Sequence, residues 1–292
     1  MSGRSETNTQ GGALESGVYV PVLIGGMARS GTTLLSALIS TSNSCNGFAP
    51  EPHYLGQLMY AITSMGLPHQ ECFSTDRHGQ LREHFGLFRK GLDEAWRTMD
   101  RPSILVLKHV YFTPMCELIG HFLPQAKFLA IMRDPRDIFA SLIRAKRKEF
   151  GVAFRDINVE KLIPQWVHRF NHYYGCVLRA AANEFRGRLL AIDHDSLCVG
   201  DIHRLSDFME LSDIDPRALW RRCIVDIHRY ENDPLFSDGW GKPLDKEFAK
   251  SHRTDLSYEV AERIQQDTMR IRAEFLTLAR GPTLQSFPVE TA

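Results

Sequence analysis

A short apolar run, followed by a glycine-rich turn and a helix start, constrains this chain more than any other feature. Val22, Leu23 and Ile24 form the apolar run, and the next residues are GGMARSGTT. Gly26 and Gly31 have the G-x-x-x-x-G spacing of a phosphate-binding loop. A strand, a glycine turn and a helix start of this kind point backbone N–H groups and the positive helix end at one anion. The stretch therefore predicts an α/β fold with an anion site at its first turn.

Further apolar runs alternate with amphipathic stretches, which is the pattern of crossover units on a parallel sheet. We expect strands at 20–24, 104–107, 127–132 and 189–192. Helical spacing occupies the segments 32–40, 54–65, 81–99, 115–122, 135–148, 159–185, 202–209, 216–230 and 257–278. The pattern predicts a P-loop-like three-layer α/β fold, with a mostly parallel central sheet of about four or five strands flanked by helices. We expect one domain over residues 18–292, after a disordered polar tail over residues 1–17.

Composition excludes several classes of function. Lysine plus arginine total 35 and aspartate plus glutamate total 35, so the net charge suggests neither a nucleic-acid partner nor an acidic membrane. No apolar run approaches the roughly 20 residues that span a bilayer, and the first residues are polar. We therefore expect a cytoplasmic protein without a membrane span. The cysteines have no C-x-x-C pair, which predicts buried free thiols rather than a zinc site or disulfides.

The glycine loop lacks one part of a nucleotide-hydrolysing loop. Such a loop carries lysine and then serine or threonine after its second glycine, whereas this chain has Thr32 and Thr33. Arg29 supplies a cation whose forked geometry suits two phosphate or sulfate oxygens. Other strand ends carry Lys108 and Arg133 rather than a carboxylate for Mg²⁺. These residues favour an anion that needs no metal, such as a sulfuryl group.

A second basic motif follows a later strand, in FLAIMRDPRDIFASLIRAKRK. Arg133 ends the apolar run, and Ser141 lies two turns into the expected helix, so both can converge on a second phosphate. Asp134 and Asp137 at the helix start complement its dipole. The alternative for this motif is a helix cap with surface charges.

Together the two motifs resemble those of the sulfotransferase family. GGMARSGTTLL resembles the 5′-phosphosulfate loop of the tyrosylprotein, carbohydrate and bacterial branches, and FLAIMRDPRDIFASLIR is similar to the family's 3′-phosphate motif. The donor implied by this resemblance is 3′-phosphoadenosine 5′-phosphosulfate, without a metal. The residues that would bind its 5′ end are Arg29, Ser30, Gly31, Thr32 and Thr33, and those that would bind its 3′-phosphate are Arg133 and Ser141.

The resemblance also implies catalytic residues. Lys108 is similar in setting to a family lysine near the bridging oxygen, where it would stabilise charge on the departing phosphate, and Arg29 would assist it. Glu51 lies in EPHY, a sequence similar to the E-x-H-aromatic motif of carbohydrate sulfotransferases, and is our candidate base; His53 would orient the acceptor. His109 is a rival base, but it lies one position from the family pattern, so we expect its side chain to point away.

Other candidates carry less weight. His168 and His172 are four residues apart on an expected helix, but they lack further metal ligands and are expected to be surface residues or polar groups of the core. His194 stands where many family members have tyrosine. The loop 237–243 either closes over the donor or is a plain surface loop.

The acceptor is expected to be a hydroxyl of a small molecule or carbohydrate. Its cleft is expected to be partly aromatic, with candidates His53, Tyr54, Phe73, Phe88, Tyr111, Phe150, Phe154 and Trp166. Two alternatives remain: a P-loop kinase or nucleotide hydrolase with an altered loop, and a non-catalytic nucleotide-binding protein on the same fold. The oligomeric state is open, and a homo-oligomer is compatible with the sequence.

Overall fold

The computed structural model describes residues 19–65, 77–151, 159–185, 187–198, 202–224 and 255–281. The expected tail over 1–17 and the loop 237–243 lie outside these residues. Within them, no helix has the length and apolar character needed to cross a membrane.

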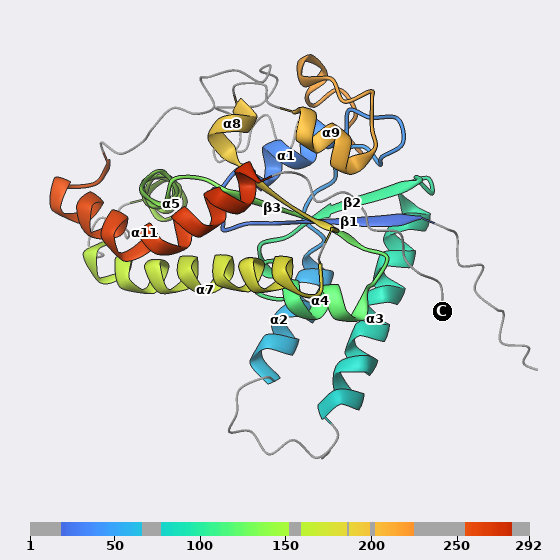
Figure 1. Cartoon of the computed structure of the whole chain (residues 1–292), viewed down its shortest axis with the longest axis horizontal. Helices are drawn as coiled ribbons and strands as arrows, with labels where there is room; N and C mark the ends of the chain where they lie inside the picture. Colours follow the sequence, from blue (N-terminus) through green and yellow to red (C-terminus); the bar gives the residue numbers. More distant parts are fainter. Residues whose placement is uncertain are drawn as a thin grey trace, which may run out of the picture.

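A parallel sheet forms the centre of the molecule (Figure 1). Its strands are β1 (Val20–Gly25), β2 (Ile104–Lys108), β3 (Lys127–Met132) and β4 (Leu189–Asp193), in the order β2-β1-β3-β4. All pairs are parallel, which confirms the predicted strands and fold class. The first strand therefore lies between β2 and β3, and the loop that follows it lies between their carboxyl ends.

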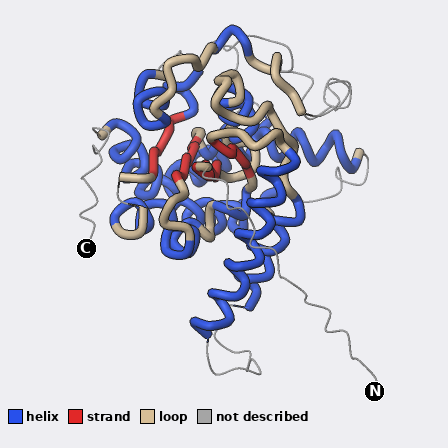
Figure 2. Tube along the Cα trace, turned by 90° about the vertical axis from the view of Figure 1, so that its right-hand side faces the viewer, coloured by secondary structure: helices blue, strands red, loops and turns tan. Residues whose placement is uncertain are grey.

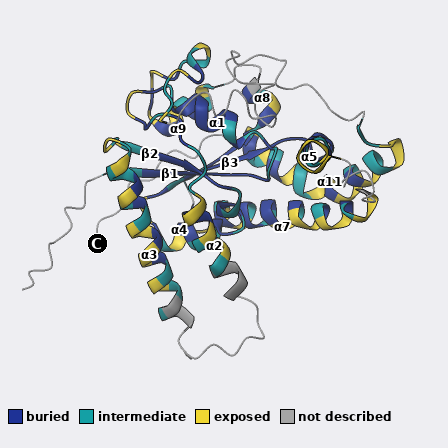
Figure 3. Ribbon diagram, turned by 180° about the vertical axis from the view of Figure 1, so that it is seen from behind, coloured by how far each residue is buried: buried dark blue, intermediate teal, exposed yellow. Residues whose placement is uncertain are grey.

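Helices cover both faces of the sheet because the strands alternate apolar residues between two cores. Leu23 and Phe128 belong to one core, whereas Ile24 and Leu129 belong to the other. The second core packs under α1 (Thr32–Ile39), α8 (His194–Cys198) and α9 (His203–Met209) (Figure 1). The core that contains Leu23 and Phe128 packs under α4 (Cys116–Phe122), α7 (Ile163–Ala182) and α11 (Tyr258–Arg280), with α5 (Pro135–Phe150) beside them. Figure 3 shows the strands buried and the outer helix faces exposed.

Helices α2 (His53–Met65) and α3 (Arg77–Thr98) project from the body as a pair, on the side of α4 and α7 (Figures 1 and 2). Short 3₁₀ turns complete the described elements: η1 (Val110–Phe112), η2 (Val159–Lys161) and η3 (Pro216–Ala218). Helix α2 contacts η1, so the α2–α3 pair is attached to the body beside the end of β2.

The predicted helix over 216–230 is wrong in its described part. Only η3 is helical, and Trp220 then has a φ of 68°. The chain next pairs with the segment after α1, because the Phe48 N–H donates to the Arg222 carbonyl (2.6 Å) and the Ile224 N–H donates to the Phe48 carbonyl (3.0 Å). These backbone bonds require an extended chain. Residues 225–230 lie outside the description.

The prediction of buried free thiols is confirmed at three described cysteines and is wrong about burial at a fourth. Cys45, Cys116 and Cys176 are free and buried, and Cys223 is free and partly exposed. Burial raises the pKa of the Cys45 thiol to about 12, so this thiol is unreactive at neutral pH.

The Asn46 side chain substitutes for a further strand at the outer edge of β2. Its amide nitrogen donates to the Val106 carbonyl (3.1 Å), and its amide oxygen accepts from the Val106 N–H (2.6 Å). Both backbone groups are buried. The amide therefore satisfies an edge that would otherwise hold two unpaired polar groups.

Replacing this amide should destabilise the protein strongly. We expect Asn46→Leu to lower the free energy of unfolding by roughly 2–6 kcal/mol, since each of two buried backbone groups loses its partner. Urea unfolding followed by circular dichroism measures the change. Asn43→Leu, at an exposed position on the same segment, is the matched control and should change little. Equal stability of the two variants would show that water or a backbone shift replaces the Asn46 amide.

Candidate active site

The glycine loop has the backbone conformation that an anion site requires. Gly31 has a φ of +102° and Arg29 a φ of 72°. A Cβ at Gly26 would lie 2.7 Å from the Ile131 carbonyl oxygen, so only glycine fits there without a shift. Helix α1 begins directly after Gly31, and no side chain caps it. Its first N–H groups are thus available to an anion, as the sequence predicts.

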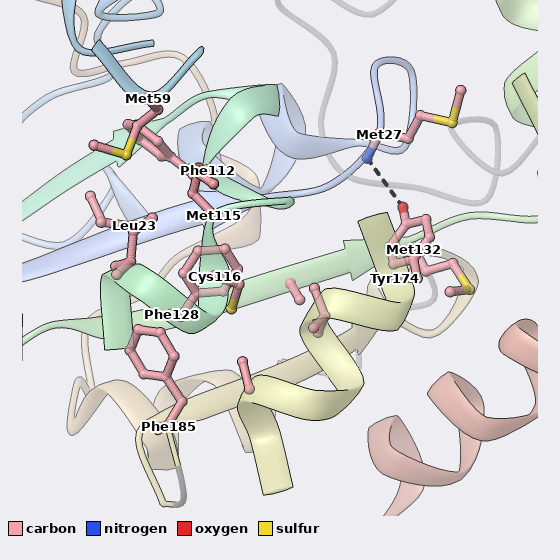
Figure 4. Packing of buried hydrophobic residues seen from close by; sticks show 14 of the residues in the cluster. Leu23, Met27, Met59, Phe112, Met115, Cys116, Phe128, Met132, Tyr174 and Phe185 are labelled. Atoms are coloured by element: carbon pink, nitrogen blue, oxygen red, sulfur yellow. Dashed lines mark hydrogen bonds between the residues drawn. The ribbon is translucent and has the colours of Figure 1, made fainter. Parts of the chain in front are cut away.

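Two residues that sequence analysis missed hold this loop in place. Thr113 Oγ1 accepts from the Gly26 N–H (2.7 Å) and donates to the Gly26 carbonyl (3.2 Å). The Tyr174 hydroxyl accepts from the Met27 N–H (3.3 Å) and donates to the Ile131 carbonyl (2.9 Å), and Figure 4 shows the Met27 contact. Burial raises the pKa of Tyr174, which keeps its hydroxyl protonated as a donor.

Sequence periodicity places Tyr174 on the buried face of its helix, but it gives no sign of which backbone groups the hydroxyl meets. Thr113 shows no sequence signal for its contact with the loop. Ser30 is fully buried and its N–H donates to the Met27 carbonyl (3.0 Å), so Ser30 supports the loop from its inner side. Thr32 is buried and Thr33 partly exposed at the start of α1.

The second motif contains the helix cap that was considered as the alternative for it, and its phosphate-binding role stays a prediction. Asp134 caps α5 by accepting from the Arg136 N–H (3.0 Å), and Arg136 and Arg272 both form ion pairs with its carboxylate. Burial acts to raise the pKa of Asp134, but these arginines more than offset it and the pKa is lowered. Half of the motif is therefore a helix cap.

The other half faces the glycine loop. Arg133 follows β3 and is 8% exposed, and Ser141 on α5 is 5% exposed. Arg29 Nε donates to Ser141 Oγ (2.9 Å), a direct bond between the two predicted donor motifs. The structure thus brings Arg29 to the motif that is predicted to bind the 3′-phosphate, whereas the sequence analysis placed Arg29 at the 5′ end and beside Lys108.

His194 also borders the loop, from the end of β4. A Cβ on Gly31 would lie 2.5 Å from His194 Cδ2, so the ring packs directly on the glycine. Asp193, just before it, caps the short helix α8, which the sequence did not predict: Asp193 accepts from the Asp195 N–H (3.4 Å) and from Ser196 Oγ (3.3 Å). Asp193 also corrects the expectation that the other strand ends carry only cations.

The proposed catalytic residues meet beside the carboxyl end of β2. Lys108 Nζ lies 3.0 Å from Glu51 Oε1, with Lys108 4% and Glu51 28% exposed. Burial lowers the pKa of Lys108, and the Glu51 carboxylate opposes this shift. The pair unites residues 57 positions apart, which sequence spacing alone could not place together.

His109 contradicts the expectation that its side chain points away. Its Nε2 lies 3.9 Å from Glu51 Oε2, and its ring lies 6.1 Å from that of His53, measured between centroids. His109 is buried, whereas His53 is exposed. Burial lowers the pKa of His109, although the Glu51 charge opposes the shift.

Glu51, His53 and His109 bring potential metal-ligand atoms within 4.8 Å of one another. Two contacts weigh against a cation there. The positive charge of Lys108 already lies against the Glu51 carboxylate. The Tyr111 N–H donates to His109 Nδ1 (3.2 Å), so the proton of a neutral ring is on Nε2. A protonated Nε2 cannot bind a metal. That the reaction needs no metal stays a prediction.

Backbone contacts join the two groups of residues. The His109 N–H donates to the Ile24 carbonyl (3.2 Å), and Lys108 pairs with Ile24 in the sheet register. The glycine loop thus has Lys108 and Glu51 on its β2 side and Arg133 on its β3 side. This is the edge at which ligands of open parallel sheets bind.

The side chains predicted to line the acceptor cleft lie in different settings, and the cleft itself stays a prediction. Phe88 is wrong as a lining residue, because it is fully buried against Phe112. Trp166 packs on Phe139. Tyr54 and Phe150 are exposed. The ring of Tyr111 lies tilted against the rings of Tyr60 and His109. Phe73 and Phe154 lie outside the described residues.

His168 and His172 are exposed on α7 with their rings stacked, as expected of surface residues.

An all-parallel sheet with a lysine-free phosphate loop at its first turn defines a P-loop-like α/β protein. The sequence profile described as "Sulfotransferase family" matches residues 21–215, so the chain belongs to the sulfotransferase family and is a transferase. A search of curated proteins finds no match to this sequence.

Solved structures agree with the fold. The sulfotransferase domain from the curacin biosynthetic pathway matches with a TM-score of 0.54 and 14% identity, over 87% of this chain and 99% of that one. The sulfotransferase domain of the Synechococcus PCC 7002 olefin synthase gives 0.55 and 17%, over 90% and 96%. A sulfotransferase from Alicyclobacillus acidocaldarius gives 0.52 and 14%, over 89% and 96%. At these identities the similarity establishes the fold alone.

Proposed function

We propose that this protein transfers a sulfuryl group from 3′-phosphoadenosine 5′-phosphosulfate to a hydroxyl of a small-molecule or carbohydrate acceptor. The observation that carries the proposal is the Lys108–Glu51 pair, which places a buried cation and a carboxylate next to an uncapped glycine loop. The reaction needs a base that accepts the hydroxyl proton and a cation that stabilises the departing oxygen, and this pair offers one of each.

Each residue has a defined role in the proposed step. The acceptor oxygen attacks sulfur while Glu51 accepts the hydroxyl proton. The bond from sulfur to the bridging oxygen breaks, and Lys108 stabilises the charge that develops on that oxygen. The products are the sulfated acceptor and 3′-phosphoadenosine 5′-phosphate. In the proposed donor site, the loop 29–33 binds the 5′ end, and Arg133 and Ser141 bind the 3′-phosphate.

A metal-dependent kinase or hydrolase fits this geometry less well. Asp193 is a carboxylate at a strand end, but it caps α8, and β3 with Arg133 separates its strand from β1. An Mg²⁺ bound beside the loop would face cations on both neighbouring strands. A non-catalytic nucleotide-binding protein has no use for a buried Lys108 held by a carboxylate, since an unneeded buried charge costs stability.

Two further points belong to the proposal rather than to the findings. We place the protein in the cytoplasm, where the donor would be available, and we treat residues 18–292 as one catalytic domain.

Calorimetric titration with 3′-phosphoadenosine 5′-phosphate tests the donor site. We expect binding that persists in EDTA, fails in Arg133→Ala and is retained in Arg217→Ala, a matched change at an 87% exposed side chain. Turnover of radiolabelled donor with phenol, sugar and amine acceptors then tests transfer. Tight Mg²⁺-dependent ATP binding, without binding of the bisphosphate, would instead favour the kinase or hydrolase.

A further inference from the structure

The backbone around His109 determines which ring nitrogen carries its proton. His109 stands between the end of β2 and η1, and its Nδ1 accepts from the Tyr111 N–H (3.2 Å), which caps the 3₁₀ turn. A backbone amide is always a donor, so Nδ1 must present its lone pair. The proton of the neutral ring is therefore on Nε2.

That Nε2–H faces the Glu51 carboxylate. Nε2 lies 3.9 Å from Glu51 Oε2, while Lys108 Nζ lies 3.0 Å from Oε1. The carboxylate is thus placed between two donors, one for each oxygen. A hydrogen bond from Nε2 requires the gap to close by about 1 Å. Catalytic hydrogen bonds are often this long before substrate binds.

Helix α2 packs against the His109 ring and limits its movement away from Glu51. A Cβ on Gly56 would come closer than 3.0 Å to three ring atoms of His109, so the helix backbone lies directly against the ring. Tyr111 and Phe112 contact other parts of the ring. This packing and the Tyr111 N–H bond hold the His109 ring with its Nε2 3.9 Å from Glu51 Oε2.

The charges around the ring favour its neutral form. The titratable groups that face it are Glu51 before α2, His53 on α2, Lys108 on β2 and Tyr111 on η1. Burial lowers the pKa of His109 first, and His53 and Lys108 lower it further, against the opposing charge of Glu51. A neutral His109 donates through Nε2 and offers no free lone pair as a base.

We propose that His109 is a positioning residue, which as the Nε2–H tautomer orients the Glu51 carboxylate toward the acceptor and is not itself the base. The inference rests on the proposed function, in which Glu51 accepts the proton. It adds that the reaction depends on His109 as a fixed donor.

The tautomer can be measured without any reaction. Nitrogen NMR of the protein labelled in its histidines, with the His109 signals assigned by their loss in His109→Asn, reports the protonation of each ring nitrogen. We expect Nδ1 unprotonated and Nε2 protonated at neutral pH. A proton on Nδ1 in the neutral ring, or a fully protonated ring, would overturn the proposal.

Two substitutions separate positioning from base catalysis. In His109→Asn the amide oxygen can still accept from the Tyr111 N–H, but no donor reaches Glu51. In His109→Gln the longer amide can return an N–H toward Glu51. The assay uses radiolabelled donor with 2-naphthol as the probe acceptor, and water serves as a second acceptor. We expect His109→Asn to lower kcat by up to about 100-fold. Gln should recover most of this loss, with KM for the donor unchanged in both.

Other results would count against positioning. If His109 were the base, Asn and Gln would lower kcat equally, and the fall of kcat on acidification would disappear in both. If its role were only structural, Tm and donor affinity would fall together with kcat, and Gln would not rescue. His168→Asn and His168→Gln, on the exposed face of α7, are the matched controls and should leave kcat, KM and Tm unchanged.

Failure of the underlying function is recognisable separately. If Glu51 is not the base, Glu51→Gln turns over normally whatever His109 does. If Glu51 is the base but His109 does not position it, Glu51→Gln loses activity while His109→Asn has the kcat of the unmodified protein.

Discussion

Glu51→Gln should lower the rate of sulfuryl transfer by about 10²- to 10⁴-fold, the usual contribution of a general base. The amide keeps the size of the side chain and an oxygen that can accept from Lys108 Nζ, which lies 3.0 Å away in the native protein. It cannot accept a proton from the acceptor at neutral pH. Donor turnover, measured with radiolabelled 3′-phosphoadenosine 5′-phosphosulfate and the best acceptor of the panel, gives the effect on kcat.

The same variant should bind 3′-phosphoadenosine 5′-phosphate as well as the unmodified protein does, because Glu51 belongs to neither of the two motifs that are proposed to bind the donor. Glu149→Gln is the matched control, since Glu149 is half-exposed and pairs with Lys146 on the same helix. Turnover of Glu51→Gln equal to that of this control would remove Glu51 from the mechanism. Loss of bisphosphate binding would show instead that Glu51 supports the donor site.

Arg29→Met should weaken the binding of 3′-phosphoadenosine 5′-phosphate by roughly 10- to 100-fold, the loss of one charge-assisted hydrogen bond. Arg29 joins the glycine loop to Ser141 through a 2.9 Å bond, so its guanidinium lies where it can serve both motifs of the donor site. Methionine keeps the length of the apolar stem and removes the charge. Calorimetric titration measures the change.

A double-mutant cycle makes this prediction sharper. Ser141→Ala alone should cost about 2- to 10-fold, as expected for a neutral hydrogen bond. Because Arg29 and Ser141 contact each other, the double variant should lose less than the two single changes combined. Arg217→Met, at an exposed arginine, controls for loss of charge. Strict additivity would mean that Arg29 and Ser141 bind the donor independently.

Much of the candidate donor site was predictable in its backbone geometry because it depends on residues close together in the sequence. Gly31 specifies the loop through a positive φ that few other residues adopt, and Gly26 through a close approach that leaves no room for a Cβ. The strand before them places the loop at the carboxyl edge of the sheet. Arg133 and Ser141 follow from the same strand-to-helix pattern. The parallel sheet and its buried strands follow from the apolar runs.

The contacts that join these segments could not be read from local patterns. Periodicity places Tyr174 on a buried helix face, but which backbone groups its hydroxyl meets depends on how α7 packs across the sheet. The predicted helix beyond Pro216 failed because backbone bonds with Phe48 outweighed its local helix propensity.

For the proposed catalytic residues, too, the sequence predicts the residues and only the fold determines how their side chains lie. The family resemblance nominates Glu51 and His109, and Lys108 follows both from the resemblance and from its place at a strand end. The direction of the His109 ring depends on Gly56, on the Tyr111 N–H and on the position of α2. Side-chain direction after a strand is set by packing partners distant in the sequence, so the family pattern suggested the wrong orientation and the folded chain corrects it.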